Sequence, residues 1–179
     1  MKGILKEILS TSIYLLVVLL ITYLIVQYVG QRTEVVGSSM ESTLSDGDNL
    51  IVDKITYRFK DPERYDIIVF PFQYEENTYY IKRIIGMPGE TVQIDDEGVI
   101  YINGEELKES YGKEVIHDPG IAQSKITLES DEYFVMGDNR NNSTDSRQAS
   151  VGNIRKKDIL GRAWLRIWPL SKLELLKHR

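Results

Sequence analysis

Two segments of the sequence carry side chains that could together perform nucleophilic catalysis. The first is residues 37–43 (Gly-Ser-Ser-Met-Glu-Ser-Thr), whose composition favours a turn that could expose the Ser39 hydroxyl. A serine hydroxyl is a weak nucleophile and needs a positioned base. The two histidines, His117 and His178, lie in contexts that suggest no catalytic role, so a lysine becomes the candidate base. Taken alone, residues 37–43 also fit an ordinary polar linker.

Lys82 is the candidate base. It lies in the β-prone run 79–85 (Tyr-Tyr-Ile-Lys-Arg-Ile-Ile), where the alternation of a strand places it on one face with Tyr80 and Ile84. An amine among such neighbours loses hydration, and this loss favours its neutral form. Lowering its pKa by roughly 3 from the free value of about 10.4 would provide a usable base near neutral pH. The alternative is that Lys82 and Arg83 extend into water from an edge strand.

A third segment, the polar residues 137–147 (Gly-Asp-Asn-Arg-Asn-Asn-Ser-Thr-Asp-Ser-Arg), could support a pair formed by Ser39 and Lys82. Asn and Asp hold tight turns through local hydrogen bonds, and Asp145 and Arg147 can form an ion pair. The Ser143 hydroxyl could orient a neutral lysine. We expect order here because so many donors and acceptors can satisfy one another. A mobile Asn-rich loop is the alternative.

An uncharged, mainly apolar run from Ile8 to Gln31 precedes these segments. As a helix it would span roughly 36 Å, enough to cross a bilayer. It is too long for the apolar part of a cleaved signal peptide, and no small-x-small pattern follows, so we interpret it as a retained anchor. A buried helix of a soluble domain is the alternative. Lys2 and Lys6 precede the run, which favours a cytoplasmic N-terminus.

Length and composition exclude several other classes. The 179 residues suffice for one compact domain behind an anchor. The formal charge of −5 and the pI near 5.2 argue against a nucleic-acid surface. Cysteine is absent, which excludes disulfides, thiolate catalysis and Cys-based zinc sites. No cluster of metal-ligating residues is visible, and we expect no metal or organic cofactor.

Short extended segments after the anchor predict a mainly β domain. Turn signals separate them, and Asn103-Gly104 is a dipeptide that type I′ turns prefer. We expect an antiparallel sheet that coils or closes into a barrel-like form. Residues 105–125 are polar and predict a surface excursion. The expected strands are 48–55, 66–70, 79–85, 91–94, 99–102, 132–136 and 159–168.

In this order the segments resemble bacterial type I signal peptidases, membrane-anchored Ser/Lys endopeptidases that release exported proteins from their leader peptides. The resemblance implies Ser39 as nucleophile and Lys82 as general base, braced by the equivalents of Ser143, Asp145 and Arg147. Residues 38–44 resemble the family's Ser-Met-x-Pro-Thr-Leu nucleophile box, 47–54 its following strand, 80–90 its base box and 137–147 its last box.

Two positions depart from the family pattern. Ser42 stands where the family usually has proline, which loosens the turn that presents Ser39. Gly37 stands where some members place a serine of the oxyanion hole, so backbone N–H groups, including that of Ser39, would have to stabilise the oxyanion. By resemblance the substrate lies extended along a strand edge, with Met40 as a wall of its pocket.

The resemblance also implies a location and partners. Residues 1–32 would form the cytoplasmic N-terminus and transmembrane anchor. Residues 33–179 would form the catalytic domain on the outer side of the plasma membrane, with a hairpin and loop excursion around 91–130. The partners would be signal-peptide-bearing preproteins and the lipid bilayer, with no nucleic acid and no obligatory protein partner.

Other functions remain open at this point. A membrane-anchored β binding module would leave the joint occurrence of Ser39, Lys82 and the Asp145/Arg147 pair without a reason. A Ser/Lys self-cleaving repressor would need a DNA-binding helix pair where this chain has an anchor. Trp164 and Trp168 either fill the β core or reach the membrane interface.

Overall fold

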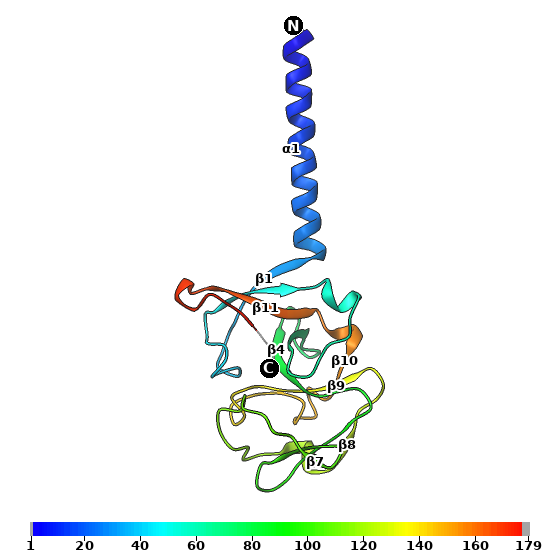
Figure 1. Cartoon of the computed structure of the whole chain (residues 1–179), viewed down its shortest axis with the longest axis vertical. Coiled ribbons are helices and arrows are strands. Elements are labelled where there is room, and N and C mark those ends of the chain that lie inside the picture. Colours follow the sequence, from blue (N-terminus) through cyan, green and yellow to red (C-terminus); the bar gives the residue numbers. More distant parts are fainter. Residues whose placement is uncertain (1, 177–179) are drawn as a thin grey trace.

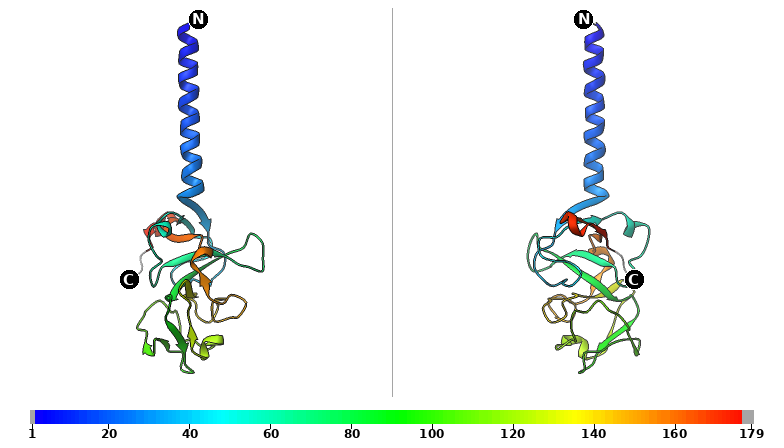
Figure 2. Two further views of the ribbon diagram at one scale, coloured as in Figure 1. Left: turned by 90° about the vertical axis from the view of Figure 1, so that its right-hand side faces the viewer. Right: turned by 60° about the vertical axis from the view of Figure 1, so that its left-hand side comes forward.

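A long helix projects from one end of a β domain (Figure 1). The structure is a computed structural model of the whole chain, and it describes residues 2–176. Helix α1 (Lys2–Tyr28) has 27 residues and would be about 40 Å long. It stands clear of the domain in all three views (Figures 1 and 2). Its segment Lys6–Ile25 is long and apolar enough to cross a membrane and is not buried by the protein, so it is not a core helix of the domain.

The larger of two antiparallel sheets forms the half of the domain next to α1. Its strand order is β1-β2-β11-β3-β4-β9-β10, with β12 paired to β11. The strands are β1 (Gly30–Glu34), β2 (Asn49–Asp53), β3 (Ile67–Pro71), β4 (Tyr79–Gly86), β9 (Glu132–Met136), β10 (Ile154–Arg155), β11 (Gly161–Trp168) and β12 (Glu174–Leu175).

A smaller sheet lies at the end of the domain away from α1 (Figure 1). Asn103 and Gly104 join two of its strands, and both have the positive φ values, 54° and 86°, that a type I′ turn requires. In the order β7-β6-β5-β8, its strands are β7 (Glu105–Glu106), β6 (Ile100–Ile102), β5 (Thr91–Ile94) and β8 (Ile126–Thr127). Single 3₁₀ turns are η1 (Thr56–Arg58), η2 (Gly120–Gln123), η3 (Lys156–Asp158) and η4 (Leu170–Lys172).

Strand β4 is covered by hydrophobic side chains on both faces. Ile81 packs in the cluster that contains Met40 and Leu50, while Ile84 and Ile85 belong to two other clusters. Strands β3 and β9 flank β4, and it is buried from Ile81 to Gly86. A polar side chain on this part of β4 must therefore find its partners inside the protein.

The mainly β, antiparallel prediction is confirmed, and most predicted strands are found within one or two residues. The edge-strand interpretation of Lys82 and Arg83 is wrong, because their exposed fractions are 4% and 1%. The surface excursion over residues 105–125 is partly wrong, since Ile116 and Ala122 are buried in the core beneath the small sheet. His117 is exposed, as expected of a histidine without a catalytic role. His178 lies outside the described residues.

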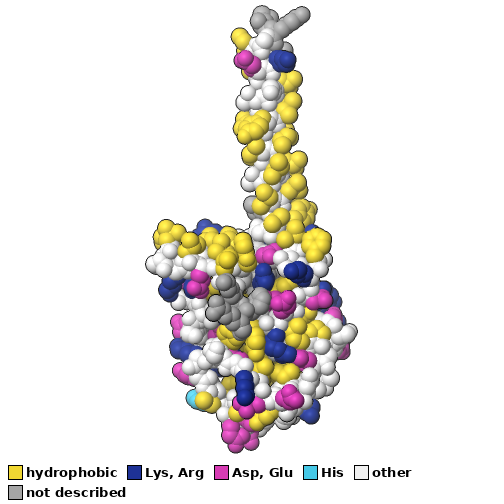
Figure 3. Space-filling view, viewed as in Figure 1, with side chains coloured by type: hydrophobic (Ala, Val, Ile, Leu, Met, Phe, Trp, Pro, Cys, Tyr) yellow, Lys and Arg dark blue, Asp and Glu magenta, His cyan; other side chains and the backbone are white. Residues whose placement is uncertain are grey.

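Strand β11 ends in an exposed apolar surface. Trp164 and Trp168 are 43% and 54% exposed, so the interpretation that both fill the β core is wrong. Three exposed leucines follow them in the chain, Leu170, Leu173 and Leu175. Figure 3 shows hydrophobic side chains gathered at the end of the domain from which α1 projects. Contact of the indoles with a membrane interface stays a prediction.

Candidate active site

The structure brings Ser39 and Lys82 into hydrogen-bond contact. Lys82 Nζ lies 2.8 Å from Ser39 Oγ and 3.0 Å from the carbonyl oxygen of Ile81. Ser39 comes from the turn between β1 and β2, and Lys82 comes from β4, so the main sheet places two distant segments side by side. Nucleophilic catalysis by serine requires a base within hydrogen-bond reach of the hydroxyl, and the amine of Lys82 occupies that position.

Burial changes the protonation of Lys82. The side chain is almost fully enclosed, and the ring of Tyr80 lies 5.0 Å from Nζ. Burial lowers the pKa of Lys82 from 10.5 to about 8, against the charges of Asp145 and Asp138, which raise it. At pH 7 about one lysine in ten is then neutral, compared with roughly one in three thousand for a free side chain. The amine can therefore act as a base.

The turn that carries Ser39 is tied down at both ends. At its start, Val35 exchanges backbone hydrogen bonds with Asp48 and Gly47, and Gly37 N–H donates to Asp46 Oδ1 at 2.7 Å. At its end, the N–H groups of Thr43 and Leu44 both donate to the carbonyl oxygen of Met40 at 2.8 Å. Gly37 has φ = +88°, which a residue with a side chain rarely adopts.

The backbone of Gly137 packs directly against Ser39. A Cβ atom at this position would lie 2.4 Å from the carbonyl oxygen of Ser39 and 2.3 Å from Ser143 Oγ, so only glycine fits. Two residues later, Asn139 N–H donates to the same Ser39 carbonyl at 3.0 Å. The side-chain amide of Asn142 donates to Ser38 Oγ at 2.8 Å. The segment 137–142 thus fixes the position of Ser39.

Asp145 and Arg147 form the predicted ion pair. Arg147 Nε and Nη2 each donate to one carboxylate oxygen of Asp145 at 2.8 Å, and both side chains are buried. Asp145 Oδ2 also accepts the Gly137 N–H, while Arg147 donates to the carbonyl oxygens of Arg140 and Asp118. The pair therefore connects the two ends of the 137–147 segment, which is ordered as predicted.

An open cleft of about 580 Å³ leads to the dyad. One wall is Thr33–Met40, the other is Asn77–Lys82, and Asn142–Thr144 complete it. β9 pairs with β4 only from Arg83 onward, and β1 is the last strand of its sheet, so both walls present strand edges to the cleft. Such edges can take up an extended peptide through backbone hydrogen bonds.

Comparison with known proteins identifies the family of this chain. Residues 7–168 match the family described as signal peptidase, peptidase S26. The chain belongs to this family. It is 40% identical to a probable signal peptidase I-2 from Synechocystis sp., over 83% of this chain and 68% of that one. It is 35% identical to signal peptidase I P from Bacillus subtilis subsp. natto, over 91% and 90%.

Among solved structures, a signal peptidase I from Enterococcus faecalis V583 is 36% identical and has a TM-score of 0.45, covering 57% of this chain and 97% of that one. The family match and the curated relatives make the protein a hydrolase of peptide bonds, a serine protease of the signal peptidase I family. The predicted family resemblance is confirmed.

Two further predicted site residues of the peptidase, Ser143 and Met40, line the cleft. Ser143 lines the cleft with Ser39 and Lys82, but its buried Oγ has no hydrogen-bond partner among the described residues, so the expected contact with Lys82 is not formed. Met40 lines the same cleft from a position that is 1% exposed. It is held firmly in the core, as a pocket wall would have to be.

A buried ion pair beside the dyad of the peptidase was not predicted. Arg83 donates to both carboxylate oxygens of Asp138, at 2.8 and 2.6 Å, and Thr43 Oγ1 donates to Asp138 at 2.5 Å. The ring of Tyr111 covers the guanidinium group, 3.7 Å from Cζ. Thr43 belongs to the turn that carries Ser39, Arg83 follows Lys82, and Asp138 opens the 137–147 segment. This cluster therefore holds the three segments of the candidate site together.

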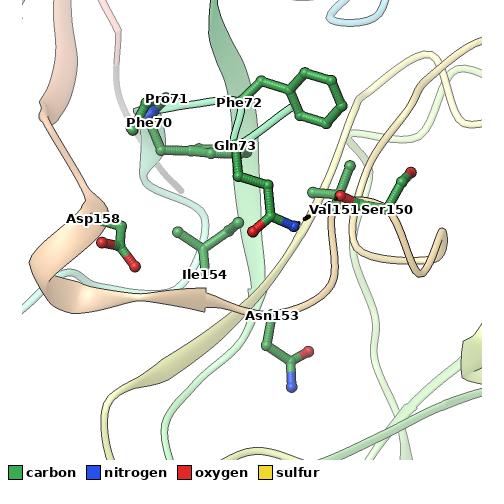
Figure 4. Close-up of a pocket in the computed structure, with 9 residues that line it drawn as sticks. All are labelled: Phe70, Pro71, Phe72, Gln73, Ser150, Val151, Asn153, Ile154 and Asp158. Carbon is green, nitrogen blue, oxygen red and sulfur yellow. Dashed lines mark hydrogen bonds between the residues drawn. The ribbon is translucent and has the colours of Figure 1, made fainter. Parts of the chain in front are cut away.

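The peptidase has another, smaller cavity, which Figure 4 shows with the residues that line it. It holds about 200 Å³ and lies between the end of β3 and the loop before β10. Gln73 crosses it to the carbonyl oxygen of Ser150 at 3.2 Å. Phe72 lines it and stacks on Tyr80, whose ring lies beside Lys82. Neither Ser39 nor Lys82 lines this cavity, so the 580 Å³ cleft is the candidate active site.

Proposed function

We propose that this signal peptidase is anchored in the membrane by α1 and removes signal peptides from exported preproteins with Ser39 as nucleophile and Lys82 as general base. The observation that carries the assignment is the 2.8 Å contact between Ser39 Oγ and a buried lysine whose pKa is lowered to about 8. Family membership supports the substrate class, since the relatives are signal peptidases.

The reaction is an acyl transfer. Neutral Lys82 accepts the hydroxyl proton of Ser39 as Oγ attacks the scissile carbonyl carbon. Backbone N–H groups, including that of Ser39, stabilise the oxyanion. The Lys82 ammonium then protonates the leaving amine, and water hydrolyses the ester to release the signal peptide and regenerate the hydroxyl. Asp145 and Arg147 position the segment that packs against Ser39.

The substrate lies extended between the two walls of the cleft. Backbone groups of the 33–36 and 79–82 edges would pair with the residues before the scissile bond, and Met40 would wall the pocket of a small side chain. The buried position of Met40 favours small side chains, since a wall that cannot move excludes large ones.

Membrane anchoring places the catalytic domain beside its substrates. Residues 1–32 hold the cytoplasmic N-terminus and the span, and residues 33–179 form the extracytoplasmic domain. Lys2 and Lys6, which precede the uncharged run from Ile8, favour this orientation. Only ten residues lie between Tyr28, the last residue of α1, and Ser39, so the dyad lies close to the outer surface of the bilayer.

Cleavage of a purified preprotein by the full chain in detergent tests the assignment. Ser39→Ala, Lys82→Ala and the double variant should each lose at least about a thousandfold in kcat/KM, with nearly equal losses because the two residues act as a unit. Ser124→Ala and Lys125→Ala, at exposed positions near the small sheet, should keep full activity. Near wild-type turnover by a folded Ser39→Ala protein would refute the nucleophile.

A further inference from the structure

A basic cleft lies on the flank of the domain, apart from the dyad. It holds about 760 Å³, and neither Ser39 nor Lys82 lines it. The charged side chains that line it are Lys54, Arg58, Lys156 and Lys157 on one hand and Asp131 and Asp158 on the other. Four cations against two carboxylates give a net charge of +2, although the whole chain carries −5.

Three of these cations are available to an anion. Lys156 is neutralised by Asp61 at 2.5 Å. Lys54 Nζ donates to the neutral amide of Gln31 at 3.1 Å. Within residues 2–176, no carboxylate forms an ion pair with Lys54, Arg58 or Lys157. These three cations outnumber the carboxylates of Asp131 and Asp158 in the cleft by one, so a net charge of +1 remains to attract an anion even with Lys156 paired to Asp61.

The cleft begins where the helix ends. The guanidinium carbon of Arg58 lies 5.6 Å from the ring centre of Tyr28, the last residue of α1. The backbone N–H of Lys54 donates to the carbonyl oxygen of Val29 at 2.9 Å, directly after the helix. Figure 3 shows Lys and Arg side chains near the base of the helix. With α1 spanning a bilayer, this end of the cleft lies at the level of the lipid headgroups.

We infer that this cleft binds the phosphodiester headgroup of an anionic phospholipid, of the phosphatidylglycerol type, in the outer leaflet. Arg58 can donate two parallel hydrogen bonds to phosphate oxygens, and Lys54 and Lys157 supply point charges. A soluble anion would not need the cleft to begin at the end of a membrane span, so the position identifies the lipid as the source. The inference rests on the proposed span but not on the proposed dyad.

A bound headgroup has a consequence for substrate access. Tyr79, at the start of β4, lines both the basic cleft and the cleft that contains Ser39 and Lys82, so the two clefts are neighbours. A lipid held in the basic cleft would attach the domain to the bilayer at a second point besides α1. Two points of attachment restrict rotation of the domain about the helix axis and thereby keep the dyad cleft at a fixed angle to the membrane.

Binding of a fluorescent short-chain phosphatidylglycerol to the full chain in zwitterionic micelles, followed by anisotropy, tests the inference. Basic residues near an anionic lipid contribute roughly fivefold each, so Arg58→Gln/Lys157→Gln should bind about thirtyfold more weakly. The control Lys108→Gln/Lys125→Gln removes the same charge from exposed positions near the small sheet and should bind like wild type. The matching phosphatidylcholine should bind weakly to all three proteins.

Four results would overturn the assignment of the cleft to an anionic lipid. Equal losses in the two double variants, or equal affinity for phosphatidylcholine, would overturn the inference. Displacement of the lipid by millimolar inorganic phosphate would indicate a soluble-anion site, and displacement by an acidic peptide would indicate a peptide site; both would overturn the lipid assignment. Flotation of wild-type protein with phosphatidylcholine vesicles checks the span separately, because it needs only α1.

Discussion

Replacing Lys82 with methionine should stabilise the protein near neutral pH while abolishing its activity. The lysine is buried and its pKa falls from 10.5 to about 8, so the folded state binds a proton more weakly than the unfolded chain does. The free energy of unfolding is lower by about 3 kcal/mol for this reason at every pH below about 8. Methionine fills a similar volume without charge, and removes this penalty.

The gain is reduced by lost contacts. The methionine side chain cannot bond to Ser39 Oγ or to the carbonyl oxygen of Ile81, and each lost hydrogen bond costs about 1 kcal/mol. The net gain at pH 7 should then be about 1 kcal/mol. Between pH 8 and 10.5 the unfolded wild type holds a proton that the folded wild type has released, so wild-type stability rises with pH. The advantage of Lys82→Met should vanish in this window and reverse above it.

Denaturant unfolding of the full chain in detergent, followed by the fluorescence of Trp164 and Trp168, measures the difference at pH 7 and pH 9.5. Lys125→Met, at an exposed position, should show no pH-dependent difference from wild type. A Lys82→Met protein that is less stable than wild type at pH 7, or whose difference is the same at both pH values, would show that burial of the amine carries no such penalty.

Three further results are expected. The kcat/KM for preprotein cleavage should rise about tenfold from pH 7 to pH 9 and then level off, following release of the Lys82 proton; a flat profile would contradict the role of this base. Gly137→Ala should lose about a hundredfold in kcat, because its Cβ would displace the Ser39 carbonyl, whereas Gly30→Ala, with a nearest contact of 3.5 Å, should be unaffected. Lipid-borne quenchers should reduce the tryptophan fluorescence of the protein in vesicles, and Trp168→Phe should reduce that quenching; no quenching of either indole would reject interface contact.

Local patterns offered Ser39 and Lys82 as candidates, and the order of the motifs that resemble signal peptidases paired them across 43 residues. Strand alternation placed Lys82 among apolar side chains, and the Gly-Ser segment suggested an exposed Ser39. The same alternation directs Arg83 to the opposite face of a strand that is buried on both sides. Its partner Asp138 lies 55 residues away, and nothing in either local pattern links the two. Such a pair is defined only by the sheet that brings β4 beside β9.

Strands without an apolar pattern escaped prediction. Residues 30–34 are Gly-Gln-Arg-Thr-Glu, which show no alternation of apolar and polar side chains. They form β1 because their backbone groups pair with all five residues of β2. Strands β10 and β12 have two residues each, which is too short for any period. The 105–125 region is ordered by side-chain contacts across the fold, such as the buried Glu109–Arg140 pair at 2.8 Å, rather than by any repeat of its own.

The junction between α1 and β1 links the enzyme to the thickness of its membrane. Only Val29 lies between the last residue of the helix and the first of the strand, and Val29 itself is bonded on both sides, to Ile25 and to Lys54. A joint this short transmits any tilt of the helix to the β domain. In the proposed anchored state, a thinner bilayer tilts the helix further and swings Ser39 to a new height above the lipid. In that state, the number of residues that a membrane-held substrate needs between its membrane segment and its scissile bond would depend on the thickness of the bilayer.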